Sequence, residues 1–462
     1  MDTMDLHDLP VPLDRASTVP LPAQVAHAVR DSVRTGLLAP GDRMPGSRSW
    51  ARDLGLSRGT VEAAYEQLRT EGYLVTRARG GTFVDPDLPA VLRRAGAVSP
   101  TPRPERTGPR VRVDLRPGAG GEPIAGDPRF RAAWRHALDA QDPEGDARGL
   151  PRLREAISEH LRLMRGTTVD PDDVLVTAGS RDGLALVLRA LRETGASPLV
   201  AVEDPGFPGL RRTLEGLPTV PVPVDGEGMD PDALDALWRA GSRPGALLLT
   251  PNHQFPHATS MPAARRAALA QWAEDHRVTV LEDDYDSEAR YAGGLTPPLF
   301  ELSRRQVAHI GTFSTVLTPV VSTGYVVATG RLGSTLRRLR EAAGPVVPLL
   351  TQRAVAEYLG TGGLRTRIGR GRRRMRAAER VAAEFAHLPG LVRAGRSLVV
   401  ETSAEVSRRL RADLAAHGVA VGDLAAGWSG DARRHGLVLA HPNAEPDDLR
   451  RVLTRIARDV GS

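Results

Sequence analysis

Near the amino terminus the spacing of apolar residues changes from helical to strand-like. Between Leu21 and Leu37 apolar positions recur every three or four residues, which predicts an amphipathic helix. Ser47 is predicted to cap a short second helix, and Ser57 to cap a third helix over residues 58–71. Alternation around a Gly-Gly pair in residues 73–84 then predicts a two-stranded hairpin. Helix, helix–turn–helix and hairpin, in this order, make up a winged helix-turn-helix.

Farther along, from residue 117 to 340, short apolar runs alternate with helical segments. Val174–Thr177, Ala246–Leu249 and Val307–Ile310 are among the runs, and they are apolar throughout, as parallel strands covered on both faces should be. The predicted fold class is therefore α/β, with a parallel-rich central sheet and helices on both faces. Residues after about 398 predict a small carboxyl-terminal α+β lobe. Ligands of such sheets bind at the carboxyl ends of the strands.

A chain of 462 residues is too long for one hydrophobic core, so two or three domains are expected. We assign residues 17–85 to the winged helix-turn-helix and residues 117–462 to the α/β body. Residues 86–116 between them are rich in proline and arginine and are predicted to be a semi-stiff linker.

The composition of the chain limits the possible cellular locations and kinds of site. No run approaches about 18 consecutive apolar residues, so no membrane span is expected. Residues 1–14 are acidic and lack the apolar stretch of a signal peptide, which favours a cytoplasmic location. The chain has no cysteine, which excludes disulfides and thiolate metal sites, and we predict no metal site.

Polar residues of the first unit are placed for contact with double-stranded DNA. Arg58 and Thr60 stand at the start of the helix that is expected to enter the major groove. Residues 1–84 contain ten acidic and ten arginine residues, so this prediction depends on placement rather than net charge, and a solvated arginine face is the alternative. The predicted DNA-binding residues are Arg43, Ser47, Arg48, Ser57, Arg58, Thr60, Arg77, Arg79 and Gly81.

This first segment resembles the DNA-binding domain of GntR-type regulators. The matching residues include Pro40-Gly-Asp-Arg-Met-Pro45, Leu56-Ser-Arg-Gly-Thr-Val61 and Gly81-Thr-Phe-Val84. The family usually has a serine where Gly46 stands. The resemblance implies an operator in double-stranded DNA as partner.

The α/β body resembles fold-type I aminotransferases, and specifically the MocR-type subgroup that joins such a body to a GntR-type domain. The resemblance runs from roughly Asp127 to Arg458. It is carried by Thr177-Ala-Gly-Ser180, Glu203-Asp-Pro-Gly-Phe-Pro-Gly209, Thr250-Pro-Asn-His-Gln-Phe-Pro256, Glu282-Asp-Asp-Tyr285 and Gly311-Thr-Phe-Ser314. It implies a homodimer and a pocket for pyridoxal phosphate.

The resemblance also implies roles within that pocket. Ser180 opens a phosphate-binding helix, Phe207 stacks on the pyridine ring, Asp283 pairs with the ring nitrogen and Tyr285 bonds the ring oxygen. The alternative for each is a polar group with a purely structural role. The residues expected to line the cofactor-like pocket are Ser180, Arg181, Phe207, His253, Gln254, Asp283, Tyr285, Ser314, Thr315 and Ser322.

Two of these positions depart from the family. Thr315 stands where the family has the lysine that bonds to pyridoxal phosphate, and a hydroxyl cannot form an imine with an aldehyde. Ser322 stands where an arginine commonly binds the cofactor phosphate. The chain contains no lysine at all, so drift in composition is an alternative explanation of Thr315. We predict that the body is catalytically inactive and binds pyridoxal phosphate noncovalently at best.

Three functions remain open from the sequence. The first is a DNA-binding transcriptional regulator whose body dimerises and senses an unidentified small molecule. The second is a pyridoxal-phosphate-dependent aminotransferase or lyase with an unusual base. The third is a regulator whose body is only a dimerisation scaffold, although the retained ring-side residues weigh against it.

Overall fold

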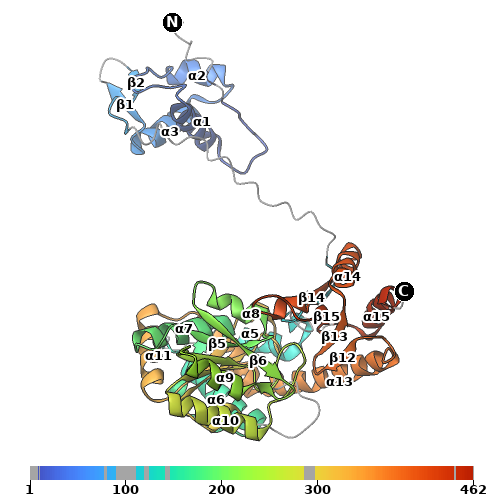
Figure 1. Cartoon of the computed structure of the whole chain (residues 1–462). Helices are drawn as coiled ribbons and strands as arrows, with labels where there is room; N and C mark the ends of the chain where they lie inside the picture. Colours follow the sequence, from blue (N-terminus) through green and yellow to red (C-terminus); the bar gives the residue numbers. More distant parts are fainter. Residues whose placement is uncertain are drawn as a thin grey trace. The chain divides into compact units, whose positions relative to one another are not determined.

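The computed structural model describes residues 9, 11–77, 81–89, 111–118, 124–140, 146–285, 297–441 and 444–460. The chain divides into two compact units, Met1–Thr107 and Gly108–Ser462, and each is treated by itself (Figure 1). Within the described ranges, no helix is both long and apolar enough to cross a bilayer.

The first unit is a winged helix-turn-helix, as predicted. Its elements are α1 (Leu21–Thr35), α2 (Ser47–Asp53), α3 (Arg58–Thr70), β1 (Leu74–Arg77) and β2 (Gly81–Val84). The two strands pair antiparallel, with Leu74 opposite Val84. The inner faces of the helices bury Val25, Val29 and Trp50, and the ring of Trp50 stacks on Tyr65 with centroids 5.6 Å apart.

One of the two predicted helix caps is wrong. Ser57 caps α3, since its side chain accepts a hydrogen bond from the backbone N–H of Thr60. Ser47, in contrast, is the first residue of α2, and the cap position is held by Gly46 with no side-chain bond. The Ser47 hydroxyl instead donates to Glu62 of α3 at 3.2 Å, because a serine inside the first turn is directed away from the free N–H groups.

The second unit is built on an eight-stranded sheet with the strand order β4-β11-β10-β9-β8-β5-β6-β7. Only β11 and β7 run antiparallel to their neighbours, so the predicted parallel-rich α/β sheet is confirmed. Its strands are β4 (Val174–Thr177), β5 (Val200–Asp204), β6 (Thr219–Asp225), β7 (Gly228–Met229), β8 (Ala246–Leu249), β9 (Thr279–Asp284), β10 (Val307–Thr312) and β11 (Gly324–Val327).

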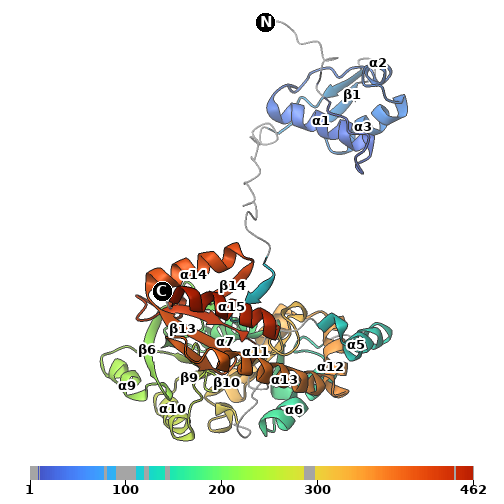
Figure 2. The same ribbon diagram turned by 90° about the vertical axis from the view of Figure 1, so that its right-hand side faces the viewer.

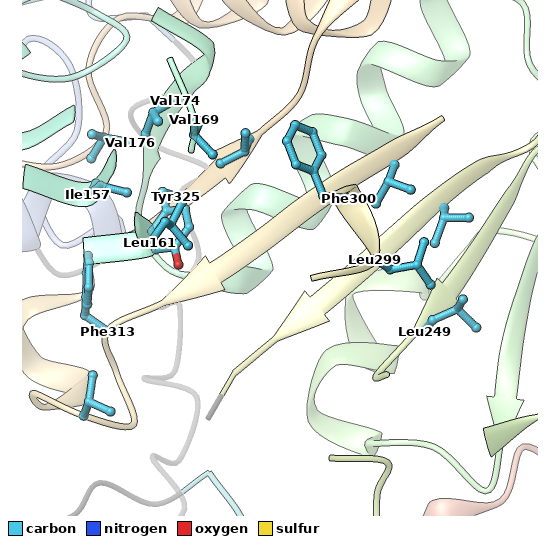
Figure 3. Packing of buried hydrophobic residues seen from close by; sticks show 14 of the residues in the cluster. Ile157, Leu161, Val169, Val174, Val176, Leu249, Leu299, Phe300, Phe313 and Tyr325 are labelled. Atoms are coloured by element: carbon cyan, nitrogen blue, oxygen red, sulfur yellow. The ribbon is translucent and has the colours of Figure 1, made fainter. Parts of the chain in front are cut away.

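Helices surround this sheet, and separate apolar clusters line its two faces. In the first cluster Ile157 and Leu161 of α6 pack on Val174 and Val176 of β4, beside Phe313 (Figure 3). The helices are α5 (Pro128–Asp139), α6 (Pro151–Arg165), α7 (Ser180–Glu193), α8 (Pro208–Arg211), α9 (Pro231–Arg239), α10 (Ala263–His276), α11 (Gly330–Ala343), α12 (Leu349–Gly360) and α13 (Gly363–Glu384).

A smaller five-stranded sheet forms the predicted α+β lobe, with the order β12-β13-β15-β14-β3. One strand, β3, comes from the range predicted as linker: Val113–Leu115 pairs parallel with β14. The other elements are β12 (Leu391–Ala394), β13 (Ser397–Thr402), α14 (Ala404–Ala416), β14 (Val419–Asp423), β15 (His435–Leu439) and α15 (Pro446–Val460), with α14 and α15 covering the sheet (Figure 2).

Candidate functional site

A pocket of about 350 Å³ opens at the carboxyl ends of the central strands. Asp283 reaches it from the end of β9, Thr312 from the end of β10, and Phe207 from the loop after β5. The hairpin between β12 and β13 closes another side with Ala394 and Arg396. The pocket therefore lies where an α/β sheet places its ligands.

The ten residues that the sequence predicts for a cofactor-like pocket all line this cavity. Asp283 and Gln254 are buried, and the others are half-buried except for Arg181 and Ser322, which are exposed at the rim. The structure brings them together from the ends of five strands, β4, β5, β8, β9 and β10, and from the start of β11; their roles toward a ligand remain predictions.

One end of the pocket has the features of an anion site. Helix α7 begins at Ser180, after Gly179 with a positive φ of 96°, and Gly179, Ser180 and Arg181 line the cavity. The first turn of a helix carries backbone N–H groups without intrahelical partners. Ser314 and Ser322 lie beside this turn, and the Ser322 hydroxyl donates to the carbonyl oxygen of Ala178 at 3.4 Å. Donors of this kind suit a phosphate or carboxylate group.

An aromatic wall forms the next side. The ring of Phe207 meets Phe255 edge-on, with centroids 5.5 Å apart. The Tyr285 hydroxyl donates to the backbone oxygen of His253 at 2.9 Å, which fixes the phenol at the cavity. Gln254 donates from its amide to the carbonyl of Pro205, so this predicted lining residue also has a structural role. Phe207 is half-buried and lines the cavity, so its ring is suited to contact with a flat apolar ring.

Asp283 is positioned by a buried charge network on the opposite face of β9. Side chains alternate along a strand, so Glu282 and Asp284 point away from Asp283. The Asp284 carboxylate accepts hydrogen bonds from the Arg165 guanidinium and from the Asn252 amide. His309 Nδ1 lies 3.0 Å from a carboxylate oxygen of Glu282. Burial by itself would raise the pKa of Glu282 and lower the pKa of His309. The charges of the pair outweigh this effect, so the pKa of Glu282 is lowered by His309 and the pKa of His309 is raised by the Glu282 carboxylate. This network holds the strand that carries Asp283.

No side chain in this pocket can form an imine with an aldehyde. Thr315 is half-buried at the cavity, and its neighbour Ser314 is held in place by Thr312, whose hydroxyl donates to the Ser314 hydroxyl at 3.1 Å. The full sequence contains arginine but no lysine. Arginine stays protonated and is no substitute for a lysine nucleophile.

Sequence reasoning missed Arg396, which lines the pocket from the turn between β12 and β13. The turn packs tightly here, since a Cβ at Gly395 would lie 3.1 Å from His253 Nε2 and 2.9 Å from Ala258 Cβ. Residues 253 and 395 are far apart in the sequence, and no local motif around Arg396 indicates that they meet.

Glu203, buried near the end of β5, is expected to make the free energy of unfolding depend on pH. Burial raises the pKa of its carboxyl group from 4.5 to about 7, and hydrogen bonds from Thr250 offset this only in part. The unfolded chain therefore loses this proton at lower pH than the folded chain, and the free energy of unfolding falls as pH rises from 4.5 to 7. The loss is roughly 3 kcal/mol.

Urea unfolding at pH 5, 6, 7 and 8 checks this prediction. A Glu203→Gln variant should lack the decline, because an amide does not titrate, and should be the more stable chain above pH 7. If the free energy of unfolding changed with pH in the same way in the natural chain and the variant, the raised pKa would not belong to Glu203.

In the first unit, the predicted DNA-binding residues gather on the surface around α2, α3 and the hairpin. Arg43, Arg48, Ser57, Arg58, Arg77 and Gly81 are exposed, Ser47 and Thr60 are half-buried, and Arg79 lies outside the described residues. Arg58 Nε donates to Glu62 at 2.7 Å, and the Arg77 guanidinium lies 4.9 Å from the centroid of the Phe83 ring. The sequence prediction had not included Glu62.

Family models match both units. Residues 21–84 match the model described as bacterial regulatory proteins, gntR family. Residues 141–421 match the model of aminotransferase class I and II. Each match falls on a different one of the two compact units.

Curated relatives match this chain over most of its length. The chain is 37% identical to the HTH-type pyridoxine biosynthesis transcriptional regulator PdxR of Corynebacterium glutamicum, over 98% of this chain and 99% of that protein. It is 33% identical to the probable rhizopine catabolism regulatory protein MocR of Rhizobium meliloti, over 78% and 76%.

Solved structures support the fold of the second unit alone. An archaeal alanine:glyoxylate aminotransferase superimposes with a TM-score of 0.68 at 20% identity, covering 76% of this chain and 90% of that chain. The α-aminoadipate aminotransferase LysN of Thermus thermophilus gives 0.66 at 24% identity, over 76% and 92%.

Proposed function

The chain belongs to the MocR-type group of gntR-family transcriptional regulators, in which a helix-turn-helix domain precedes an aminotransferase-like domain, and from this we propose that its second unit senses a small ligand without bonding to it covalently. The observation that carries the proposal is a pocket at the strand ends, lined by all ten predicted residues, in a chain without any lysine. The fold family normally binds pyridoxal phosphate, and its usual attachment needs an amine.

Pyridoxal phosphate fits this pocket as a noncovalent ligand. The start of α7, with Ser180 and Ser314, would hold the phosphate, and Phe207 would lie against the ring. Asp283 would pair with the ring nitrogen, which is the interaction that makes this cofactor an electron sink when it is bound. The relative from Corynebacterium glutamicum is named for pyridoxine biosynthesis, which favours a vitamer of this class as effector.

An enzymatic role is disfavoured by the residues themselves. Thr315 would stand where a lysine is needed, and no lysine elsewhere in the chain can replace it. We propose that the aminotransferase-like unit is catalytically inactive. Turnover of any amino acid by the purified chain with added pyridoxal phosphate would contradict this.

DNA recognition is proposed to use the exposed residues around α3, with the chain acting as a homodimer on a two-fold operator. Arg58 stands at the first position of α3, where side chains reach base edges. We expect Arg58→Ala to weaken operator binding by about 1–3 kcal/mol.

Fluorescence anisotropy with DNA fragments that copurify with the chain measures this loss. The matched control is Arg34→Ala, which removes a half-exposed arginine at the end of α1. Equal affinities for the natural chain and the Arg58→Ala variant would remove Arg58 from the contact surface.

A further inference from the structure

Helix α13 carries a row of exposed arginines on the second unit. Arg365, Arg373, Arg376 and Arg380 are exposed, and with Gly369 they recur at intervals of three or four residues. All five positions therefore share one face of the helix. From Arg365 to Arg380 this α13 arginine row is about 22 Å long. Figures 1 and 2 show the helix in orange near α15, which it contacts.

Among the described residues, three of the four arginines in the row are not neutralised by acidic partners, whereas Arg365 interacts with the charge of Glu159. Within the described part of the chain, Arg373, Arg376 and Arg380 make no ion pair and no side-chain hydrogen bond. The acids on neighbouring positions already have arginine partners: Glu159 with Arg162, Glu379 with Arg393, Glu384 with Arg450, and Glu445 with Arg374. An unneutralised row of this kind attracts a polyanion.

Gly369 is a second, independent indication that an outside partner approaches this face of α13. Glycine in the interior of a helix destabilises it relative to alanine, so a packing reason is usually found. Here a Cβ at Gly369 would meet nothing within 4 Å among the described residues apart from its chain neighbours and the backbone of its own helix, and the same holds for Gly371. The missing side chain at Gly369 leaves the row open to close approach from outside between Arg365 and Arg373.

The chemistry of the row favours a nucleic acid over a protein. Protein interfaces have an apolar centre, and none of the exposed large hydrophobic residues among the described residues lies on α13. Guanidinium groups are the preferred donors to phosphate oxygens. A row of about 22 Å extends over roughly six base pairs of duplex.

We propose that the α13 arginine row binds the phosphate backbone of DNA, as a sequence-independent contact made by the aminotransferase-like unit. This inference rests on the proposed DNA-binding function and adds a second DNA surface to it. Contacts of this kind increase affinity and its dependence on salt without changing which sequence is preferred.

The test compares the full chain with an Arg373→Gln/Arg376→Gln/Arg380→Gln variant on a random-sequence duplex of about 60 base pairs. The variant should bind at least about tenfold more weakly at about 0.1 M salt. The slope of log affinity against log salt should fall by about two to three, one unit for each lost phosphate contact. The control Arg189→Gln/Arg192→Gln/Arg212→Gln removes equal charge from exposed positions on α7 and on the short 3-10 helix Arg212–Leu214, and it should match the natural chain.

Equal binding of the two triple variants would overturn the proposal. So would a change of sedimentation mass in the α13 variant, because it would make the row a protein interface. If the natural chain itself retains no DNA, the proposed function fails and this inference fails with it, whereas natural-chain binding with equal variants removes only the α13 surface.

A Gly369→Ala variant adds a readout that loss of charge does not give. Alanine should stabilise the helix and raise Tm by roughly 2 °C. If DNA comes close to this position, the same variant should bind the long duplex more weakly in spite of its higher stability. Unchanged DNA affinity in the stabilised variant would contradict close approach at Gly369.

Discussion

A Thr315→Lys variant is expected to form a covalent bond with pyridoxal phosphate that the natural chain cannot form. Thr315 lines the pocket beside Ser314 and the start of α7. A lysine there would present its amine to an aldehyde held by the phosphate and ring contacts that we propose. We expect the apparent Kd for pyridoxal phosphate to fall by about two orders of magnitude, or roughly 3 kcal/mol.

The labelled lysine can be assigned directly in this experiment, because the introduced lysine is the only one in the protein. Borohydride reduction followed by peptide mass mapping should place the adduct at position 315. The control Arg189→Lys puts one amine on an exposed turn of α7 outside the pocket and should remain unlabelled at low ligand concentration. Equal labelling of the two variants, or none at 315, would contradict the proposed ligand position.

The largest loss of stability is expected from Asp284→Ala. Asp284 is 5% exposed and accepts hydrogen bonds from Arg165 and Asn252, with His309 Nε2 3.7 Å away. Removing the carboxylate leaves the Arg165 charge in a buried site without its main partner. Such a loss costs about 3–5 kcal/mol.

Chemical denaturation of the full chain, followed through the transition of the second unit, measures this effect. Asp235→Ala is the matched control, since it removes an acid from an i, i+4 pair with the exposed Arg239. That change should cost no more than about 0.5 kcal/mol. A difference below about 1 kcal/mol between the two variants would show that the buried network does not stabilise the fold as argued.

The pocket was predictable because its residues follow strand ends in compact local motifs. Asp283 and Tyr285 come directly after an apolar run, and Phe207 follows another, so their convergence follows from the rule for parallel sheets. Arg396 was not predictable in this way. It enters the cavity from a hairpin of the second sheet, and only long-range packing brings that hairpin to residues 253–258.

The limits of local reasoning appear in the fold as well. β3 lies in a proline- and arginine-rich stretch that predicts a linker, yet it pairs with β14 about 300 residues later. Serine is a preferred residue type at a helix cap, but Gly46 holds the cap position of α2. The Ser47 hydroxyl donates a hydrogen bond to Glu62 instead. In both cases a partner remote in sequence decides the outcome over local propensity.

The most direct test of the central claim is the DNA affinity of the natural full chain with and without pyridoxal phosphate, before and after dialysis of the ligand. The account predicts that saturating ligand changes affinity for copurifying DNA by about 5–150-fold, the usual range for coupled sites, and that dialysis restores the original value. An affinity that does not respond to the ligand, or a response that survives dialysis together with an increase in the mass of the chain, would contradict it.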